Sequence, residues 1–177
     1  MTTGNKIATF LALAATATGV YLLLKNRNNM KQTNQQSDRE DTERIPRGYR
    51  NNNPLNIRYV KANNWLGKTL PNTDGVFEQF YIMPYGYRAA FVLLQNYIAQ
   101  GYKTVSDIIH RWAPTSENNT AGYINRVCST TGFTPAAVIH PDNKDEMTKL
   151  VYAMALVENG YTPLPDVNEI EQGWNLI

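Results

Sequence analysis

Arg47-Gly48-Tyr49-Arg50-Asn51-Asn52-Asn53-Pro54-Leu55-Asn56-Ile57-Arg58-Tyr59 is the stretch around which the folded part of this chain is predicted to be organised. Three consecutive asparagines run into Pro54, whose ring disfavours helical backbone at the residue before it. Asparagine side chains also bond to nearby backbone in turns. We therefore expect an ordered loop instead of a helix or a core element. Its many amide and guanidinium groups indicate the floor of a binding site, and a well-bonded structural turn is the alternative.

The composition is that of one globular domain with an appendage. The chain has 177 residues, of which 42% are hydrophobic and 18% charged, and its net charge is +2. Because there is no strongly basic field, we expect no nucleic-acid partner. Cys128 is the single cysteine, and the only histidines are His110 and His140. These counts exclude a disulfide within the chain, a cysteine-rich zinc site and a three-histidine metal site. We expect no metal and no cofactor.

Residues 1–25 are predicted to form an N-terminal transmembrane anchor. The segment 7–24 is uncharged and mostly apolar. As a helix its 18 residues would cover roughly 27 Å, close to the thickness of a bilayer core. A cleaved signal peptide is the alternative, but Lys25 and Arg27 stand where its cleavage site should be. The basic excess after the segment favours a cytoplasmic side for the rest of the chain.

The next segment, 26–44, is predicted to be a flexible polar tether. It consists almost entirely of polar and charged residues, so it cannot bury enough apolar surface to offset its chain entropy. The globular domain is then expected to span 45–177.

Within that domain the sequence predicts a small early β-hairpin followed by helices. The segment 76–80 is expected to be a short strand that anchors Phe77 and Phe80 and leaves Glu78 and Gln79 near the surface. Apolar residues at helical spacing and their caps predict helices from Pro84 to about 100, 105–113, 120–131, 144–159 and 166–177. The fold class is therefore α+β, mostly α.

Carboxylates are the best candidates for chemistry, because no glycine-rich phosphate loop and no serine nucleophile elbow is present. Cys128 lies inside a predicted helix, which argues against a cysteine peptidase. Glu117 stands in a tight turn after Trp112, and a carboxyl group against an indole can act as a general acid. A structural pairing with the following helix N-terminus is the alternative. Glu158, Glu169 and Glu171 are expected on solvated helix faces.

Five motifs follow one another in the folded part of the chain: Arg47 to Arg58, Trp65-Leu66-Gly67, Gly86-Tyr87-Arg88-Ala89-Ala90, Arg111-Trp112-Ala113-Pro114 and Glu117-Asn118-Asn119-Thr120. In this order they resemble a phage protein family, the virion structural proteins of icosahedral phages with an internal membrane. That family has a Gly-Ile-Arg-Asn-Asn-Asn-Pro-Gly-Asn-Ile-Arg signature. The resemblance covers about 47–132 and departs from the signature at Tyr49 and Leu55.

A second set of segments follows the same direction along the chain: Asn53 to Arg58, Trp65 to Gly67, Phe77 to Phe80 and Tyr87 to Tyr97. In this order they are similar to the motifs of lysozyme-superfamily glucosaminidases and lytic transglycosylases. This resemblance implies a lysozyme-like domain whose loop grips glycan. Those enzymes carry their acidic glutamate upstream of the asparagine-containing segment, where this chain has Glu43. The candidate acids are therefore Glu117, Glu43 and Glu78. Sugar contacts are expected from Asn51, Asn52, Asn53, Arg58 and Trp65, with Arg88 and Trp112 shaping the cleft; any of these could instead be internal bonding.

These features lead to two hypotheses. In the first, the chain is a membrane-anchored phage protein that cleaves the β-1,4 bond of peptidoglycan, as a lytic transglycosylase or a muramidase or glucosaminidase would. Its partners would be glycan strands, the membrane and other virion proteins, and it would reside in the virion's internal membrane or the bacterial inner membrane. In the second, it is a non-catalytic virion protein that links capsid and internal membrane.

Overall fold

The structure, a computed structural model, describes residues 45–161 and 163–177. Within this part of the chain, Ile45–Ile177 is a compact unit of its own. The predicted anchor (1–25), the predicted tether (26–44) and Glu43 lie outside the described residues. No helix among the described residues combines the length and the apolar character needed to cross a membrane.

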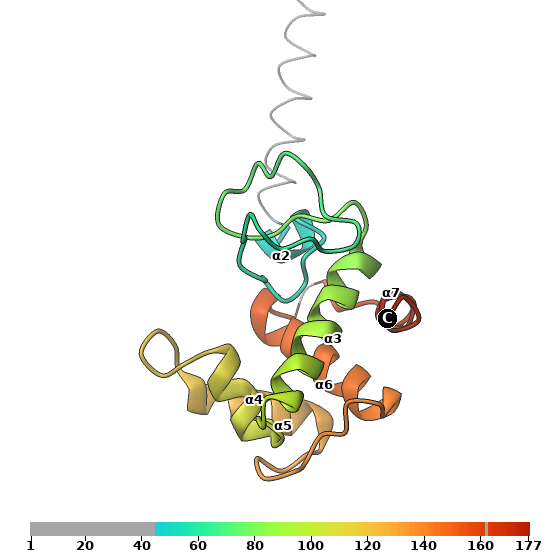
Figure 1. Cartoon of the computed structure of the whole chain (residues 1–177). Coiled ribbons are helices and arrows are strands. Elements are labelled where there is room, and N and C mark those ends of the chain that lie inside the picture. Colours follow the sequence, from blue (N-terminus) through green and yellow to red (C-terminus); the bar gives the residue numbers. More distant parts are fainter. Residues whose placement is uncertain (1–44, 162) are drawn as a thin grey trace, which may run out of the picture. The chain divides into compact units, whose positions relative to one another are not determined.

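The described residues form a mostly helical domain (Figure 1). In Figure 1 the loops of 51–82 lie toward the N-terminal end of the longest helix, α3, and helices α4 and α5 lie toward its C-terminal end. The helices are α2 (Arg47–Arg50), α3 (Met83–Ala99), α4 (Val105–Trp112), α5 (Thr120–Thr131), α6 (Lys144–Asn159) and α7 (Val167–Trp174).

Helix α3 is the centre of the core, as its apolar stripe predicts. Tyr87, Phe91 and Leu94 are completely buried on it. Helix α7 packs against α3, and the Trp174 ring meets the Phe91 ring edge-on at 5.2 Å between centroids. Aromatic pairs favour this arrangement. The expected return of Trp174 to the domain is therefore confirmed.

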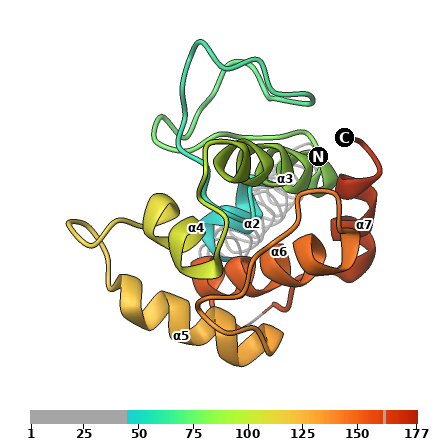
Figure 2. The same ribbon diagram turned by 60° about the horizontal axis from the view of Figure 1, so that its bottom comes forward.

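Helix α6 supplies the other large share of the core, with Met147, Leu150, Val151 and Met154 inward. It contacts α3, α5 and α7, and Figure 2 shows it beside α7 and below α3. Burial of an apolar stripe of this size contributes on the order of 1.5–3 kcal/mol for each large side chain. The predicted helix 144–159 is confirmed at both ends.

Side-chain caps fix where the helices begin. Thr104 and Asp107 form the predicted capping box at α4, in which each side chain accepts a bond from the other's backbone N–H. Asn143 accepts bonds from the N–H groups of Asp145 and Glu146 at the start of α6. Asn119 and Asp166 cap α5 and α7 in the same way. Each cap satisfies backbone donors that the first helical turn leaves open.

The predicted β-hairpin is not formed as regular strands. Within 45–161 and 163–177 the only β pairing consists of isolated bridges, Arg58 with Phe77, Lys68 with Phe80 and Thr104 with Val138. Side-chain amides bond to backbone carbonyls that would otherwise be available for pairing between strands. Asn53 donates to the Glu78 carbonyl and Asn72 to the Phe77 carbonyl. The early segment 57–81 is thus a set of loops with short pairings.

The asparagine-rich stretch also begins differently from the prediction. Its first residues form the helical turn α2, in which the N–H groups of Tyr49 and Arg50 donate to the Pro46 carbonyl. The loop proper starts at Asn51 and passes close over α3 at Gly86, where a Cβ atom would collide with the Asn52 carbonyl oxygen. Glycine at this position lets the loop seat on the central helix.

Candidate functional site

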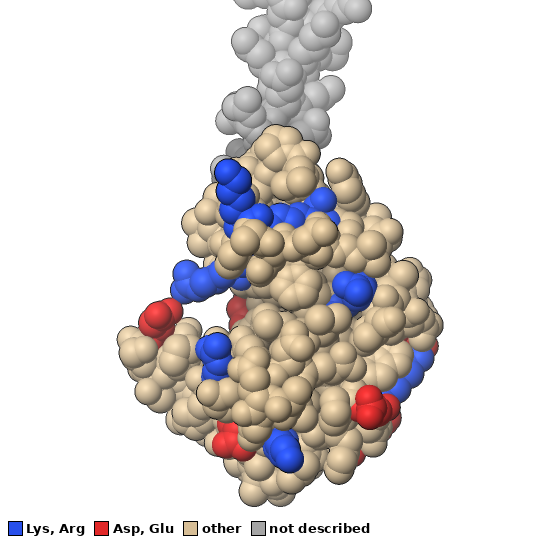
Figure 3. Space-filling view, in the orientation of Figure 1, with Lys and Arg blue, Asp and Glu red and all other residues tan. Residues whose placement is uncertain are grey.

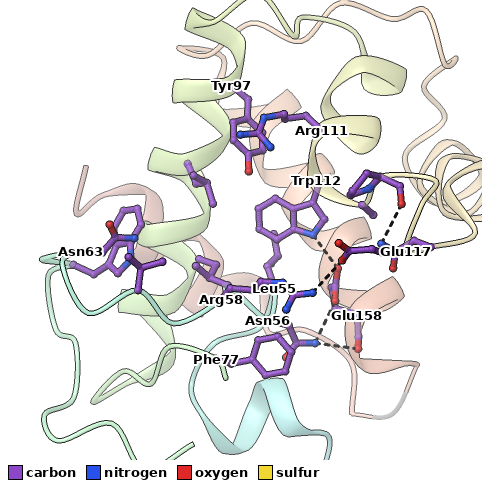
Figure 4. Close-up of a pocket in the computed structure, with 17 residues that line it drawn as sticks. Leu55, Asn56, Arg58, Asn63, Phe77, Tyr97, Arg111, Trp112, Glu117 and Glu158 are labelled. Carbon is purple, nitrogen blue, oxygen red and sulfur yellow. Dashed lines mark hydrogen bonds and ion pairs between the residues drawn. The ribbon is translucent and has the colours of Figure 1, made fainter. Parts of the chain in front are cut away.

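A cavity of about 510 Å³ opens between the loop after α2, the C-terminal half of α3, the end of α4 with the turn that follows it, and the end of α6. Figure 3 shows the hollow on the face of Figure 1, with a basic and an acidic side chain meeting at its mouth. Figure 4 shows how its labelled side chains converge. Its lining includes four aromatic side chains and two carboxylates, together with guanidinium and amide groups: Trp65, Phe77, Tyr97, Trp112, Glu117, Glu158, Arg58, Arg111, Asn56, Asn63 and Asn118.

Glu158 is the most strongly bonded polar group of this cavity. Its Oε1 accepts hydrogen bonds from Trp112 Nε1 at 2.9 Å and from the Tyr123 hydroxyl at 3.0 Å. Asn56 Nδ2 donates to its Oε2 at 3.2 Å. Burial, and then the Glu158 carboxylate, raises the pKa of Tyr123 well above its ordinary value. A carboxylate with three donors is therefore fixed on the cavity wall.

This arrangement corrects the expectation that Glu158 lies on a solvated face. The side chain is half-buried. It follows Val151 by seven residues and Met154 by four, which places it on the inward face of α6 at its last turn. The helical spacing alone therefore indicates an inward position for residue 158. A solvated position was expected because the residue is charged.

Glu117 lies at the mouth of the cavity and forms an ion pair with Arg58, at 3.2 Å between Oε2 and Nη2. The two predicted site residues therefore meet, although they are 59 positions apart in the chain. The Glu117 side chain is 60% exposed, so the indole of Trp112 does not shield it from water. The side-chain cap of the following helix, α5, is supplied by Asn119.

Asn51, Asn52 and Asn53 are not brought to the cavity, which corrects their expected role. Asn53 is completely buried, donates to the carbonyls of Ile57 and Glu78 and accepts from the Ile57 N–H. Asn52 donates to the Phe80 carbonyl. These amides fasten the loop to 76–81, so the alternative of a well-bonded structural turn describes them.

Asn51 belongs to a separate charged cluster on the same loop. Its amide donates to Asp74 at 2.8 Å, and Arg47 donates to the two oxygens of Asp74 at 2.7 and 2.6 Å. The Arg47 bonds, together with those from Asn51 and the backbone, hold the pKa of Asp74 far below its ordinary value. This cluster ties α2 to the turn before Val76 without reaching the cavity.

The expected position of Glu78 near the surface is wrong, because the residue is completely buried. Its carboxylate pairs with Lys68 Nζ at 3.1 Å and accepts the Val60 N–H. The Lys68 side chain is 6% exposed, and its Nζ lies 4.6 Å from the Tyr59 ring centroid. Glu78 does not line the cavity, and its bonds explain it as an internal ion pair.

Of the remaining predicted residues, Trp65 and Trp112 line the cavity, whereas Arg88 does not. Arg88 Nε donates to the Leu176 carbonyl at 2.8 Å and so fastens the C-terminal segment to α3. The cavity also contains three residues that the sequence does not predict, Arg111, Asn56 and Tyr97, because only the packing of α3, α4 and the loop brings them together. Within the described ranges no three His, Cys, Asp or Glu side chains gather as a metal site would require.

A phage protein is similar to this chain over most of its length. The chain is 36% identical to "Protein P5" of Pseudoalteromonas phage PM2 over 131 residues, which cover 72% of this chain and 79% of the relative. No family model matches the chain. The relative is a phage protein, as the first resemblance implied. The chain therefore belongs to the family of Protein P5 of Pseudoalteromonas phage PM2.

Proposed function

We propose that this chain is a phage virion protein whose folded domain binds a peptidoglycan glycan strand in the cavity and cleaves its β-1,4 bond. The observation that carries the proposal is the combination of aromatic rings with carboxylates in one cavity: Trp65, Phe77, Tyr97 and Trp112 with Glu117 and Glu158. Aromatic rings offer flat apolar surfaces, and a few placed polar groups fix a ligand's orientation. The similarity to a phage protein supports the virion assignment.

In the proposed reaction the two carboxylates have different roles. Glu117 is exposed at the cavity mouth and, once its pair with Arg58 has opened, would in its protonated form give its proton to the leaving glycosidic oxygen. A water molecule, or in a transglycosylase a hydroxyl of the same sugar, would then bond to the anomeric carbon and return a proton to Glu117. Glu158 is held by Trp112, Tyr123 and Asn56 and would stay a carboxylate, stabilising positive charge at the sugar's anomeric carbon. Glu43 stays a predicted alternative for the acid.

The same proposal includes three further parts: a membrane anchor over 1–25, a flexible tether over 26–44 and a lysozyme-like fold for the domain 45–177. Their support is the apolar segment 7–24 and the order of motifs from Arg47 onward. The protein would then reside in the virion's internal membrane or the bacterial inner membrane, with the domain reaching cell-wall glycan and other virion proteins as partners.

Gel zymography of the purified full-length protein against cell-wall material tests the enzymatic part. We expect clearing by the natural chain and none by Glu117→Gln. Glu171→Gln is the matched control, because Glu171 is 51% exposed and does not line the cavity. Clearing that survives Glu117→Gln but disappears in Glu43→Gln would move the acid to the upstream segment.

A second candidate is a non-catalytic virion protein that links capsid and internal membrane. It is favoured because both cavity carboxylates already have partners within the domain. Arg58 pairs with Glu117, and Trp112, Tyr123 and Asn56 donate hydrogen bonds to Glu158. Absence of clearing from correctly folded protein would support this candidate and overturn the enzymatic one.

A further inference from the structure

Arg111 differs from the other charged groups of the cavity. It stands in the last turn of α4 and lines the cavity. Its guanidinium carbon lies 5.0 Å from the centroid of the Tyr97 ring and 6.0 Å from that of Tyr102. Within the described part of the chain no carboxylate pairs with it, whereas Arg58 is paired with Glu117.

The two carboxylates of the cavity already bond to other groups and do not pair with Arg111. Glu158 accepts from Trp112, Tyr123 and Asn56, and Glu117 accepts from Arg58. Figure 4 shows Arg111 against Tyr97, apart from Glu117 and Glu158. Stacking on the ring restrains the guanidinium without using its N–H donors in the plane. The group is thus a restrained cation on the cavity wall with donors available to a ligand.

We propose that Arg111 binds a carboxylate of the ligand and makes the cavity selective for acidic glycans over neutral ones. This inference rests on the proposed glycan-binding function and names its substrate class. A planar guanidinium binds a carboxylate through two parallel hydrogen bonds. Peptidoglycan offers that group either on the lactyl ether of a peptide-free muramic acid or on the stem peptide, whereas a chitooligosaccharide offers none.

Titration of the full-length protein in detergent with three probes tests the inference. The probes are peptide-free peptidoglycan strands, peptide-bearing strands and a chitooligosaccharide. We expect the natural chain to bind at least one acidic probe roughly tenfold or more tighter than the neutral one, because charge-assisted bonds are strong. Whichever acidic probe is preferred identifies the lactyl or the stem-peptide carboxylate as the bound group.

Arg111→Gln should abolish this preference, so that the acidic probe binds no tighter than the chitooligosaccharide, and Arg111→Lys should retain only part of it. Arg126→Gln is the matched control, since Arg126 is an exposed arginine on α5 that does not line the cavity. Thermal denaturation checks that each variant is folded. A preference that survives Arg111→Gln overturns this inference alone. Absence of binding to all three probes by the natural chain overturns the proposed function and this inference with it.

Discussion

Trp112 donates its indole N–H to Glu158 at 2.9 Å and thereby joins the last turn of α4 to the last turn of α6. The two residues are 46 positions apart, and both line the cavity. Tyr123 adds a bond from α5 to the same oxygen, and Asn56 adds one from the loop. A single carboxylate therefore connects four separate parts of the chain around the site.

Replacing Glu158 by alanine should destabilise the domain, because it leaves three donors without their acceptor. We expect the free energy of unfolding to fall by about 1–3 kcal/mol, as is typical when a partner of buried polar groups is removed. Glu158→Gln keeps a carbonyl acceptor and should cost less. Urea denaturation followed by tryptophan fluorescence measures both. An alanine variant as stable as the natural chain would contradict the bonding role assigned to Glu158.

Asn53→Ala should be more costly than an ordinary loop substitution. Asn53 bonds to Ile57 and Glu78 and is completely buried, so alanine leaves the Ile57 N–H and the Glu78 carbonyl unsatisfied, while the Ile57 carbonyl keeps the bond from the Glu78 N–H. We expect a loss of roughly 2–4 kcal/mol in unfolding free energy. Asn64→Ala, at an exposed position, is the control and should change stability by less than about 0.5 kcal/mol. Equal effects in the two variants would mean that the Asn53 bonds contribute little.

Lys68 and Glu78 form a buried ion pair, so the changes in unfolding free energy caused by replacing each residue should not add up in the double variant. Glu78→Gln leaves the Lys68 ammonium buried without its counter-charge and should cost about 3–5 kcal/mol. Adding Lys68→Met to that variant removes the uncompensated charge and should restore part of the loss. Chemical denaturation of the two single variants and the double variant completes the cycle. Strict additivity would contradict a direct interaction between the two residues.

Asp74 should make the domain sensitive to acid. Hydrogen bonds from Arg47 are the largest cause of its lowered pKa, and the side chain is 8% exposed. Because the folded pKa is below the ordinary value of 3.8, the ionised group stabilises the fold above about pH 4. This contribution is lost as pH falls from there through the lower folded value. Asp74→Asn should be less stable at neutral pH and show a weaker pH dependence between pH 4 and 2. Identical pH profiles of the two proteins, measured by thermal denaturation, would contradict the assignment.

The helices could be predicted from sequence because their signals are local. The stripe from Tyr87 to Ile98, the capping box at Thr104 and the cap at Asn143 each depend on residues within a few positions of one another. Local propensity and periodicity carry such information. The predicted helix starts therefore agree with the structure to within a few residues.

The early loops could not be predicted in the same way, because their bonds join distant residues. Glu78 was expected at the surface from the two phenylalanines beside it, yet Phe77 is only partly buried and Glu78 faces inward to Lys68. Asn53 bonds to a carbonyl 25 positions away. Among the predicted site residues, Arg58, Trp65, Trp112 and Glu117 line the cavity. The three asparagines are bonded inside the loop, and Glu78 and Arg88 bond elsewhere in the domain.

Binding of a glycan strand in the cavity beside Glu117 and Glu158 can be measured directly through the three tryptophans of the chain. Trp65 and Trp112 line the cavity, whereas Trp174 packs on Phe91 and is absent from the lining. Their indole N–H signals can be followed by NMR during titration of the full-length protein in detergent with peptidoglycan glycan strands. We predict that the Trp65 and Trp112 signals shift with saturation while the Trp174 signal stays in place. Signals that do not move at all, or a shift confined to Trp174, would contradict glycan binding in the cavity.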